Sequence, residues 1–372
     1  MPRHVVVVGA GYGGLATAKL VAEQRGTRVT LVNADAHFTE RVRLHQVAAG
    51  QRVRRRPLVE LLGEAPVRLV IGRVVAIQPE DREVRLADGT SLAYDTLIYA
   101  LGSSGNPNGA PGAAEHAYPL AVAEDAERLR ERLAVTERVT VVGGGLTGIE
   151  AASELAESHP ELSVRLVTGG HLGAGLSRRG TRHLRRTFAR LRVQLHEHTR
   201  VVEVRPDGVR LADGTLLDAD TVVWATGFRA PELAREAGFA VHEDGRMLVD
   251  WTLRSLSHPE VYAVGDAALA CSPDGHHLRM ACAVAVPSAG HLSRVVADRA
   301  AGAEPRALRH RFVTRCVSLG RRDALVQYVR ADDSPVERMV LTGRAAALVK
   351  ELIVRGALTA QRRPGLARLA SR

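Results

Sequence analysis

The hydrophobic pattern of the chain begins with a short apolar run at residues 5–8, which leads into a glycine-rich turn at residues 9–14. Apolar residues then recur with helical spacing over residues 15–24, and a run of branched residues follows at 28–32. Strand, turn, helix and strand in this order predict a dinucleotide-binding βαβ unit. The same series is predicted a second time, at residues 139–142, 147–158 and 163–167.

Each copy also ends in a similar strand–turn–strand segment. The first reads RLADGTSLAYDTLIYALG over residues 85–102, and the second reads RLADGTLLDADTVVWATG over residues 210–227. The Asp-Gly pair in each is typical of a hairpin turn. We expect meander strands at residues 67–77 and 83–86, and a strand at 96–100 that returns to the sheet. The matching strands of the second copy are expected at residues 201–211 and 221–225.

The arrangement of these copies predicts the domain organisation. Gly, Pro, Ser and Asn are concentrated at residues 102–119, which indicates a linker. The apolar run before Gly265 has no partner in the second copy, so we expect it to return to the first sheet. We therefore predict an α/β protein with two Rossmann-like three-layer domains, the second inserted into the first, and a C-terminal α+β unit. The expected boundaries are residues 1–108 and 231–300 for the first domain, 109–230 for the second, and 301–372 for the C-terminal unit.

Composition agrees with this fold and excludes several classes of protein. The 372 residues include 35 glycines and few aromatic residues, which suits tight turns in an α/β protein. The net charge of +10 comes almost entirely from arginine and is spread along the chain, without a nucleic-acid-reading module. The three cysteines are too far apart for a disulfide framework or a zinc ribbon, and we expect no metal site. No apolar stretch approaches the roughly 20 residues of a membrane span, so a cytoplasmic protein is expected.

The glycines of the first turn have distinct roles in such a fold. Gly9 allows the tight turn, Gly11 lets the backbone approach a pyrophosphate, and Gly14 permits close helix–strand packing. The helix that begins near Gly13 directs its free N–H groups at the phosphate. Asn33 follows the second strand, where an acid usually binds the ribose. The second turn repeats the glycines at Gly143, Gly145 and Gly148.

These motifs resemble the two-dinucleotide-binding-domain flavoproteins of the pyridine nucleotide-disulfide oxidoreductase superfamily. That family has a second FAD motif, a strand ending in Gly-Asp, and the segment that ends in Gly265 and Asp266 is similar to it. The resemblance implies that the first domain binds FAD and that Asp266 binds the ribityl chain. Gly102 and Gly227, which end the two copies, are included among the expected cofactor-binding residues.

The branch of the family is indicated by residues 38–46, which contain no cysteine, unlike the CxxxxC pair of the disulfide reductases. The segment from His45 to Gly50 is similar to the type II NADH dehydrogenase branch, which includes apoptosis-inducing-factor-like quinone reductases. The polar residues 40–43 and the absence of glutamine at residues 280–287 depart from that pattern and leave quinone specificity open. Candidates for the substrate face of the flavin are Glu40, Arg41, Arg43 and His45. His45 is expected to shuttle a proton near neutral pH; alternatively, the arginines, Arg41 among them, bind the FAD pyrophosphate or cover the surface.

The second copy is then expected to bind NAD(P)H. The resemblance implies that Glu150 lies where nicotinamide meets flavin and that it orients the nicotinamide or relays protons. A carboxylate near a helix N-terminus is the alternative interpretation. Thr168 stands where an NAD-selective site usually has an acid, so a 2′-phosphate is tolerated and NADPH is slightly favoured over NADH. Arg178 and Arg179 either bind that phosphate or form a solvated helix face.

Taken with the resemblance, these observations predict hydride transfer from NAD(P)H to N5 of FAD and electron transfer to a quinone or quinone-like small molecule. A ferredoxin or rubredoxin reductase and a flavin-based redox sensor are the alternatives. Nucleic acid is not an expected partner. The apolar stripe at residues 344–355 either contacts a membrane peripherally or packs on the first domain, and a homodimer is left open.

Overall fold

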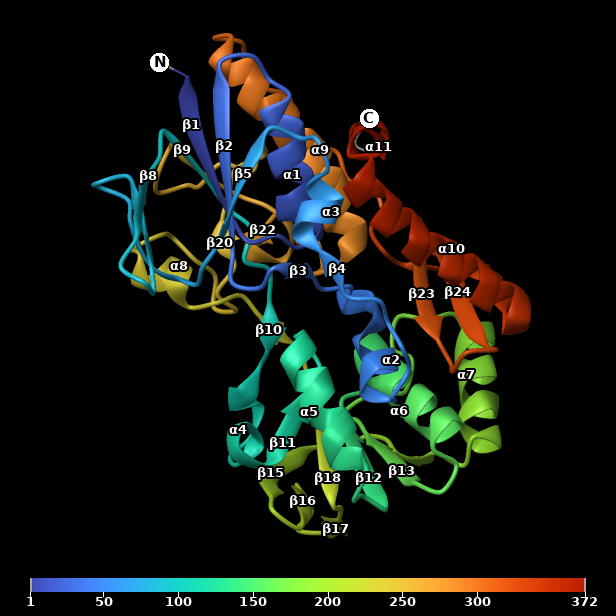
Figure 1. Cartoon of the computed structure of the whole chain (residues 1–372). Helices are drawn as coiled ribbons and strands as arrows, with labels where there is room; N and C mark the ends of the chain where they lie inside the picture. The colour runs from blue at the N-terminus through green and yellow to red at the C-terminus, as the bar shows by residue number, and fades with distance from the viewer. Residues whose placement is uncertain (1, 371–372) are drawn as a thin grey trace.

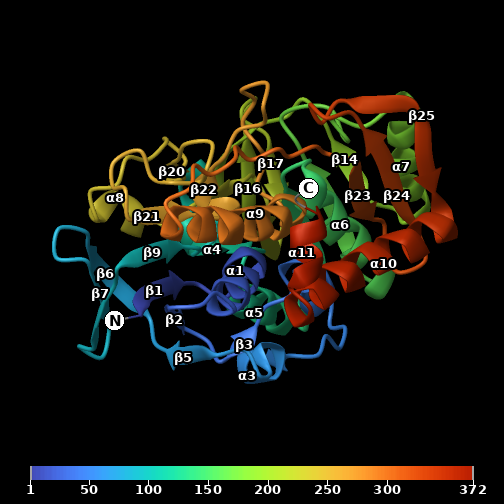
Figure 2. The same cartoon turned by 90° about the horizontal axis from the view of Figure 1, so that it is seen from above.

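The computed structural model describes residues 2–370 and contains two five-stranded parallel sheets (Figure 1). In the first sheet the strand order is β21-β9-β1-β2-β5. Helices α1 (Tyr12–Ala22) and α9 (Cys282–Ala300) pack against each other beside it (Figure 2). The strands are β1 (Arg3–Val8), β2 (Thr27–Asn33), β5 (Val67–Ile71), β9 (Thr96–Tyr99) and β21 (Val261–Ala263).

The second sheet has the order β11-β18-β12-β13-β14, again with every pair parallel, and differs from the first in that its edge strand β11 precedes the repeat along the chain. Its strands are β11 (Ala117–Pro119), β12 (Arg138–Val142), β13 (Ser163–Val167), β14 (Gln194–His196) and β18 (Thr221–Trp224). Its helices are α5 (Ala123–Leu133), α6 (Leu146–Ser158) and α7 (Arg178–Arg190). Two Rossmann-like units in one chain confirm the fold class predicted from the sequence.

Each repeat also carries a three-stranded antiparallel meander. The prediction of one meander strand at residues 67–77 was wrong, because the chain breaks at Gly72, whose N–H donates to the Asn33 carbonyl oxygen at 2.9 Å. β5 therefore joins the parallel sheet, and only the following strand enters the meander. The strand predicted at residues 201–211 is likewise divided by a turn. The meander strands are β6 (Val74–Gln78), β7 (Glu83–Leu86), β8 (Ser91–Ala93), β15 (Val201–Arg205), β16 (Gly208–Leu211) and β17 (Leu216–Asp218).

The segment between the repeats is more ordered than the predicted linker at residues 102–119. β10 (Ser104–Gly105) pairs antiparallel with β19 (Phe228–Arg229), so the outgoing and returning chains form a two-stranded connection between the domains. The last three residues of the segment are β11, which joins the second sheet. Between them lie η2 (Pro107–Gly109) and α4 (Ala113–His116).

The C-terminal unit is a three-stranded antiparallel sheet followed by the long helix α10 (Gly343–Arg362), which extends well beyond the predicted apolar stripe. α10 runs past both domains (Figure 1). Its C-terminal carbonyls of Gln361 and Arg362 accept hydrogen bonds from Lys19 Nζ on α1, at 3.0 and 3.1 Å. No helix among residues 2–370 is long and apolar enough to span a membrane. The sheet consists of β23 (Thr314–Ser318), β24 (Ala324–Val329) and β25 (Pro335–Thr342), and α11 (Gly365–Ala370) ends the described chain.

Shorter elements complete the fold. Of these, α2 matters most, because it leaves the first domain and packs against α5 and α6 of the second (Figure 1). The remaining elements are β3 (His37–Phe38), η1 (Arg41–Arg43), α2 (Leu44–Ala48), β4 (Arg56–Pro57), α3 (Leu58–Leu62), α8 (Leu233–Glu236), β20 (Met247–Leu248), η3 (Gly265–Ala267) and β22 (Ala268–Leu269).

Candidate functional site

The glycine turns of the two repeats form the same backbone cradle. Gly9 and Gly143 have φ values of +101° and +123°, and a Cβ at either would lie 2.4 or 2.3 Å from a carbonyl oxygen of the neighbouring strand. A Cβ at Gly14 or Gly148 would lie 1.9 or 2.0 Å from the carbonyl oxygen of the first glycine. Only glycine fits these four positions, because the helix packs directly on the turn.

The space in front of each helix is open. Gly11 and Gly145 are the N-caps of α1 and α6, and a Cβ at either would meet nothing within 4 Å. The unpaired N–H groups and the positive dipole end of each helix face this space. Such a site suits a pyrophosphate, so the residues present fit a dinucleotide at each turn. Gly13, in the first turn of α1, faces the Val264 side chain and Gly265 of η3.

The residue after the second strand differs between the repeats. Asn33 Oδ1 accepts a hydrogen bond from the Ala10 N–H at 2.9 Å, and its Nδ2 donates to the Asp35 carbonyl at 2.7 Å. The amide thus fixes the loop beside the turn. Thr168 is buried in the matching position, and its hydroxyl would lie 2.5 Å from a Cβ at Gly144. Neither site has a carboxylate directly after its second strand.

Asp266 lies at the end of β21, in the short helix η3, as the Gly-Asp motif suggested. Its Oδ2 accepts a hydrogen bond from Ser103 Oγ at 2.8 Å and lies 3.5 Å from Arg41 Nη1. Arg41 also donates to Ser103 Oγ at 3.1 Å and lies over the Phe228 ring. Gly102, with φ +69°, places Ser103 here, and Gly265, with φ +71°, turns the chain into η3. The structure therefore brings Arg41, Gly102 and Asp266 together.

Glu40 and Arg43, two candidates for the substrate face, are occupied by ion pairs. Glu40 is buried and pairs with Arg43 at 3.1 Å and Arg56 at 3.3 Å. Arg43 also pairs with Glu351 of α10 at 2.8 Å. These contacts connect the loop after β3 to the C-terminal helix. Their charges are compensated within the protein, which favours a structural role for both residues.

His45 lies at the interface between the domains, because α2 inserts its Leu44, Ala48 and Ala49 into the core of the second domain. The ring is buried, with Nδ1 3.7 Å from Glu150 Oε2 and Nε2 3.9 Å from Glu154 Oε2. Burial lowers the pKa of His45 to about 4, against the opposing effect of Glu150. The expectation that His45 titrates near neutral pH was therefore wrong, since desolvation keeps the imidazole neutral there.

Glu150, on α6, makes an ion pair with Lys350 of α10 through its Oε1, which also accepts the Ser318 N–H at 2.9 Å. Burial would favour the neutral acid, but Lys350 and its other partners hold the pKa of Glu150 below its ordinary value. Glu150 in turn raises the pKa of Lys350, although burial acts in the opposite direction. A charged pair is thus enclosed where α6, β23 and α10 meet.

Glu154, one turn further along α6, is the acid in this cluster that titrates near neutrality. Its side chain is fully buried, and burial raises its pKa to about 7. Oε1 accepts a hydrogen bond from Gln51 Nε2. Within residues 2–370, neither Oε2 nor the His45 Nε2 that it faces has a hydrogen-bond partner. Two unpartnered polar atoms facing each other in a buried site mark a place where a proton can be exchanged.

Sequence reasoning missed three members of the site: Glu154, Lys350 and Ser103. Glu154 had a signal, because it lies four residues after Glu150 and therefore on the same face of the helix. Lys350 could not be found, since its partner is 200 residues away along the chain. Ser103 directly follows Gly102, but nothing in the sequence connects it to Asp266.

The remaining candidates lie elsewhere. Gly227 ends the second repeat with φ +131°, and a Cβ there would meet nothing within 4 Å. Arg178 and Arg179 are exposed in the first turn of α7, and the Arg178 N–H donates to Glu337 Oε2 at 3.1 Å. Residues 2–370 contain no cluster of three or more metal-binding side chains, and the three cysteines are free.

Comparison with known proteins gives a consistent result. Residues 3–289 match the family model described as pyridine nucleotide-disulphide oxidoreductase. An NADH dehydrogenase-like protein of Mycobacterium tuberculosis (strain CDC 1551 / Oshkosh) is 32% identical over 306 residues, which cover 75% of this chain and 76% of the relative. A terpredoxin reductase of Pseudomonas sp is 30% identical over 326 residues, with 80% and 75% covered.

A solved structure of NDH2 from Plasmodium falciparum in complex with NADH superposes with a TM-score of 0.82. The match covers 97% of this chain and 98% of that one, at 15% sequence identity. At this identity the likeness establishes the fold alone. The fold therefore extends over the C-terminal unit, which lies outside the match to the family model.

Proposed function

The chain belongs to the pyridine nucleotide-disulphide oxidoreductase family, and from this premise we propose that it passes electrons from NAD(P)H through FAD to a quinone or quinone-like small molecule. The family membership predicted from the motifs is confirmed, and the protein is an NAD(P)H-dependent flavoprotein oxidoreductase. The identity of the electron acceptor is our proposal.

The observation that carries the proposal is the pair of open glycine cradles together with the absence of cysteine from residues 38–46. Two cradles fit two dinucleotides, and without a cysteine in residues 38–46 the chain lacks the redox disulfide through which the disulfide reductases pass electrons. A small acceptor that reacts directly at the cofactor is then the simplest outlet. The similarity to an NADH dehydrogenase-like protein supports a small-molecule acceptor.

The first domain would hold FAD. Gly9, Gly11 and Gly14 would accept the pyrophosphate at the N-terminus of α1, and Asp266 would accept hydrogen bonds from the ribityl hydroxyls. Ser103 and Arg41 orient the Asp266 carboxylate. When bound, the flavin supplies the two-electron chemistry that no side chain of this protein can provide.

The second domain would hold the nicotinamide cofactor at Gly143, Gly145 and Gly148. Glu150, kept ionised by Lys350, would accept a hydrogen bond and orient the nicotinamide. Because its pKa is depressed, Glu150 does not itself store a proton at neutral pH. Its function in this proposal is to position the ring and to keep the enclosed charge balanced.

The proton that accompanies electron transfer would be stored on Glu154. Its Oε2 faces His45 Nε2, and His45 Nδ1 faces Glu150 Oε2. A neutral imidazole can accept a proton on one nitrogen while releasing one from the other, so His45 need not become charged in a stable state. A small rotation of the ring or of the carboxyl group would bring each pair into hydrogen-bonding distance.

We propose NADPH as the preferred donor. Thr168 offers a neutral hydroxyl where an acid would repel a 2′-phosphate, and Gly169 and Gly170 leave space beside it, since a Cβ at either would meet nothing within 4 Å. Arg178 and Arg179 add positive charge at the start of α7, on the same carboxyl edge of the sheet.

We also propose a peripheral contact with the cytoplasmic face of a membrane through α10. Leu348 and Leu352 are 69% and 67% exposed on this helix, and Arg344 and Arg355 flank them. An exposed apolar stripe between arginines suits an anionic lipid surface. Cosedimentation with anionic vesicles that is lost in Leu348→Ser/Leu352→Ser would support this contact.

A second candidate is a reductase for a small iron–sulfur protein, which the 30% identity to terpredoxin reductase favours. One experiment separates the two candidates and also the redox-sensor alternative. The purified yellow protein is reduced anaerobically with NADH or NADPH in a stopped-flow instrument and then mixed with a soluble quinone, with ferredoxin or with oxygen. We expect the quinone to reoxidise it fastest. Faster reoxidation by ferredoxin would favour the second candidate, and slow reoxidation by every acceptor would favour a sensor.

A further inference from the structure

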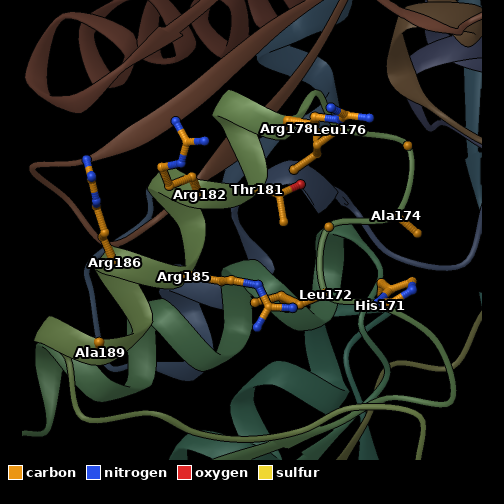
Figure 3. A pocket seen from close by; sticks show the side chains of 12 residues that line it. His171, Leu172, Ala174, Leu176, Arg178, Thr181, Arg182, Arg185, Arg186 and Ala189 are labelled. Atoms are coloured by element: carbon orange, nitrogen blue, oxygen red, sulfur yellow. The ribbon is translucent and has the colours of Figure 1, made fainter. Parts of the chain in front are cut away.

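A groove on the outer face of the second domain shares only Arg178 with the donor site proposed above. It has a volume of about 700 Å³ and lies between the loop at residues 171–176 and the exposed face of α7 (Figure 3). Figure 3 shows Arg178 and Arg182 on one side, Arg185 with His171 on the other, and Thr181 between them. Leu172 and Leu176, both buried, give the groove apolar lining on its two sides.

The charge of α7 is largely uncompensated. The helix contains six arginines and no acidic residue. Arg185 pairs with Glu197 at 2.6 Å and Arg190 pairs with Asp323 at 2.9 Å. Within residues 2–370, no ion pair involves the other four, namely Arg178, Arg179, Arg182 and Arg186. The Glu337 carboxylate near the start of the helix accepts the backbone N–H of Arg178.

The spacing of the arginines on α7 is electrostatically unfavourable for the helix. Arg178, Arg182 and Arg186 follow each other at i, i+4 spacing, where like charges repel. The first turn carries two arginines and no acid of its own, and the Glu337 carboxylate of β25 supplies one there by accepting the Arg178 N–H. A bound anion would relieve the repulsion among the three arginines. The arginines are therefore better explained by a ligand than by the stability of the helix.

The shape of the groove indicates which anion. Guanidinium groups bind phosphate in a bidentate manner, and the apolar lining from Leu172 and Leu176 suits a ring system. From Arg178 to Ala189 the lining extends over about 16 Å of helix, at the usual rise per residue. That length provides for more than one phosphate. The volume also lies within the range of sites for small organic ligands.

We propose that this groove binds a nucleoside diphosphate at a site separate from the dinucleotide cradle. The N-terminus of α7 lies at the carboxyl edge of the sheet, near the adenosine end of the expected hydride donor. The rest of the groove runs away from that edge, because α7 returns antiparallel to β13 and β14. A single 2′-phosphate of the donor would reach only its first turn. The diphosphate of a second nucleotide would lie between Arg182 and Arg186.

Isothermal titration of ADP into the flavin-loaded protein tests the proposal, with the dinucleotide cradle first saturated with NADP⁺. We expect saturable binding that weakens about tenfold or more in Arg182→Gln/Arg186→Gln, as loss of charge-assisted hydrogen bonds requires. The matched control is Arg130→Gln/Arg309→Gln, which removes two exposed arginines that likewise have no ion pair within residues 2–370. The control should bind ADP like the wild type.

Absence of ADP binding in the presence of NADP⁺, or equal affinity in all three proteins, would overturn the proposal. Displacement of NADP⁺ by ADP would also contradict it, because the two ligands would then share one site. Flavin content and NADH-dependent turnover should be unchanged in both double variants. These two readouts show that the proteins are folded, and they keep a failure of this proposal distinct from a failure of the proposed electron transfer. If Arg182→Gln/Arg186→Gln does not fold, Arg186→Gln alone serves in the same titration.

Discussion

The two nucleotide cradles have the same backbone but different surroundings. Where α6 of the second repeat carries Glu150 and Glu154, α1 of the first repeat carries Ala16 and Leu20, both fully buried. The first helix therefore has no ionisable side chain at these two positions. The second faces α2 and α10 through a buried cluster of charged and polar groups. Backbone geometry makes a phosphate site, but the helix face behind it decides what chemistry the site supports.

The residues that complete each site also come from different places. The first is completed by Ser103, Arg41 and Asp266, all within the first domain. The second is completed by His45 from the other domain and Lys350 from the C-terminal helix. A site closed by its own domain suits a resident cofactor. A site closed by parts of three units suits a ligand that enters and leaves.

The largest effect is expected from a substitution that blocks cofactor binding at one cradle and leaves the other intact. Gly11→Val places a side chain in the open space before α1, and the φ of −73° at this position is allowed for valine. We expect a folded protein without FAD, since the valine occupies the pyrophosphate position. Gly145→Val is the matched control and should retain FAD. Absorbance near 450 nm per protein measures both, and a yellow Gly11→Val protein would contradict the assignment.

Lys350 distinguishes the second site from the first, because it pairs with Glu150 on α6 where α1 carries the apolar Ala16. Lys350→Met leaves the Glu150 carboxylate enclosed without its cation. Loss of one partner of a buried pair costs about 3–5 kcal/mol in the free energy of unfolding, and less if the carboxyl group takes up a proton. Urea denaturation at pH 7 measures this cost, with Lys350→Arg as the charge-preserving control. Unfolding at the wild-type urea concentration would show that the pair contributes nothing.

Glu154 adds a pH dependence that the first repeat, with Leu20 at the same position, does not have. Burial raises its pKa to about 7, so its ionisation opposes folding. Its contribution to stability is present in full below pH 4.5 and is lost as the pH rises through 7. Relative to the wild type, Glu154→Gln should therefore become more stable across this interval, by at most about 3 kcal/mol.

Denaturation of the two proteins at pH 4.5, 6 and 8 measures this difference. Glu131→Gln is the control, because it removes an exposed carboxyl group from another helix, α5. A constant difference between Glu154→Gln and wild type across the pH range would show that Glu154 titrates in the ordinary range for a carboxyl group.

A smaller effect is expected from Thr168, the residue after the second strand of the second repeat, on the selectivity between NADPH and NADH. Thr168→Asp restores the acid that repels a 2′-phosphate, and we expect the KM for NADPH to rise about tenfold while the KM for NADH changes little. Steady-state kinetics with both donors measures the ratio. An unchanged KM for NADPH would place the 2′-phosphate elsewhere.

Local patterns predicted most of the fold. The two apolar runs with their glycine turns gave β12 and α6 to within one residue and β1 and α1 to within three, because strand, turn and helix are specified by neighbouring residues. The break at Gly72 was missed, since both sides of it have the same strand pattern. The antiparallel pairing of β10 with β19 joins segments more than 120 residues apart, and no local signal reveals it.

The candidate site was predictable only where it depends on the turns. His45 was recognised as a residue of interest, but its burial could not be anticipated, because polar residues directly precede α2 and the helix packs into the other domain. The neutral state of its ring follows from that packing. Lys350 is one of only two lysines in the chain, yet its rarity alone did not indicate its ion pair with Glu150.

Anaerobic mixing of flavin-loaded Gly145→Val with NADPH tests the assignment of the two cradles most directly. The valine points into the open space before α6 and leaves the first domain intact. We predict that the flavin absorbance of this variant stays unbleached on the time scale on which the wild type is reduced, while dithionite bleaches both proteins equally. Rapid bleaching of Gly145→Val by NADPH would contradict the account, because the hydride donor would then bind outside the second cradle.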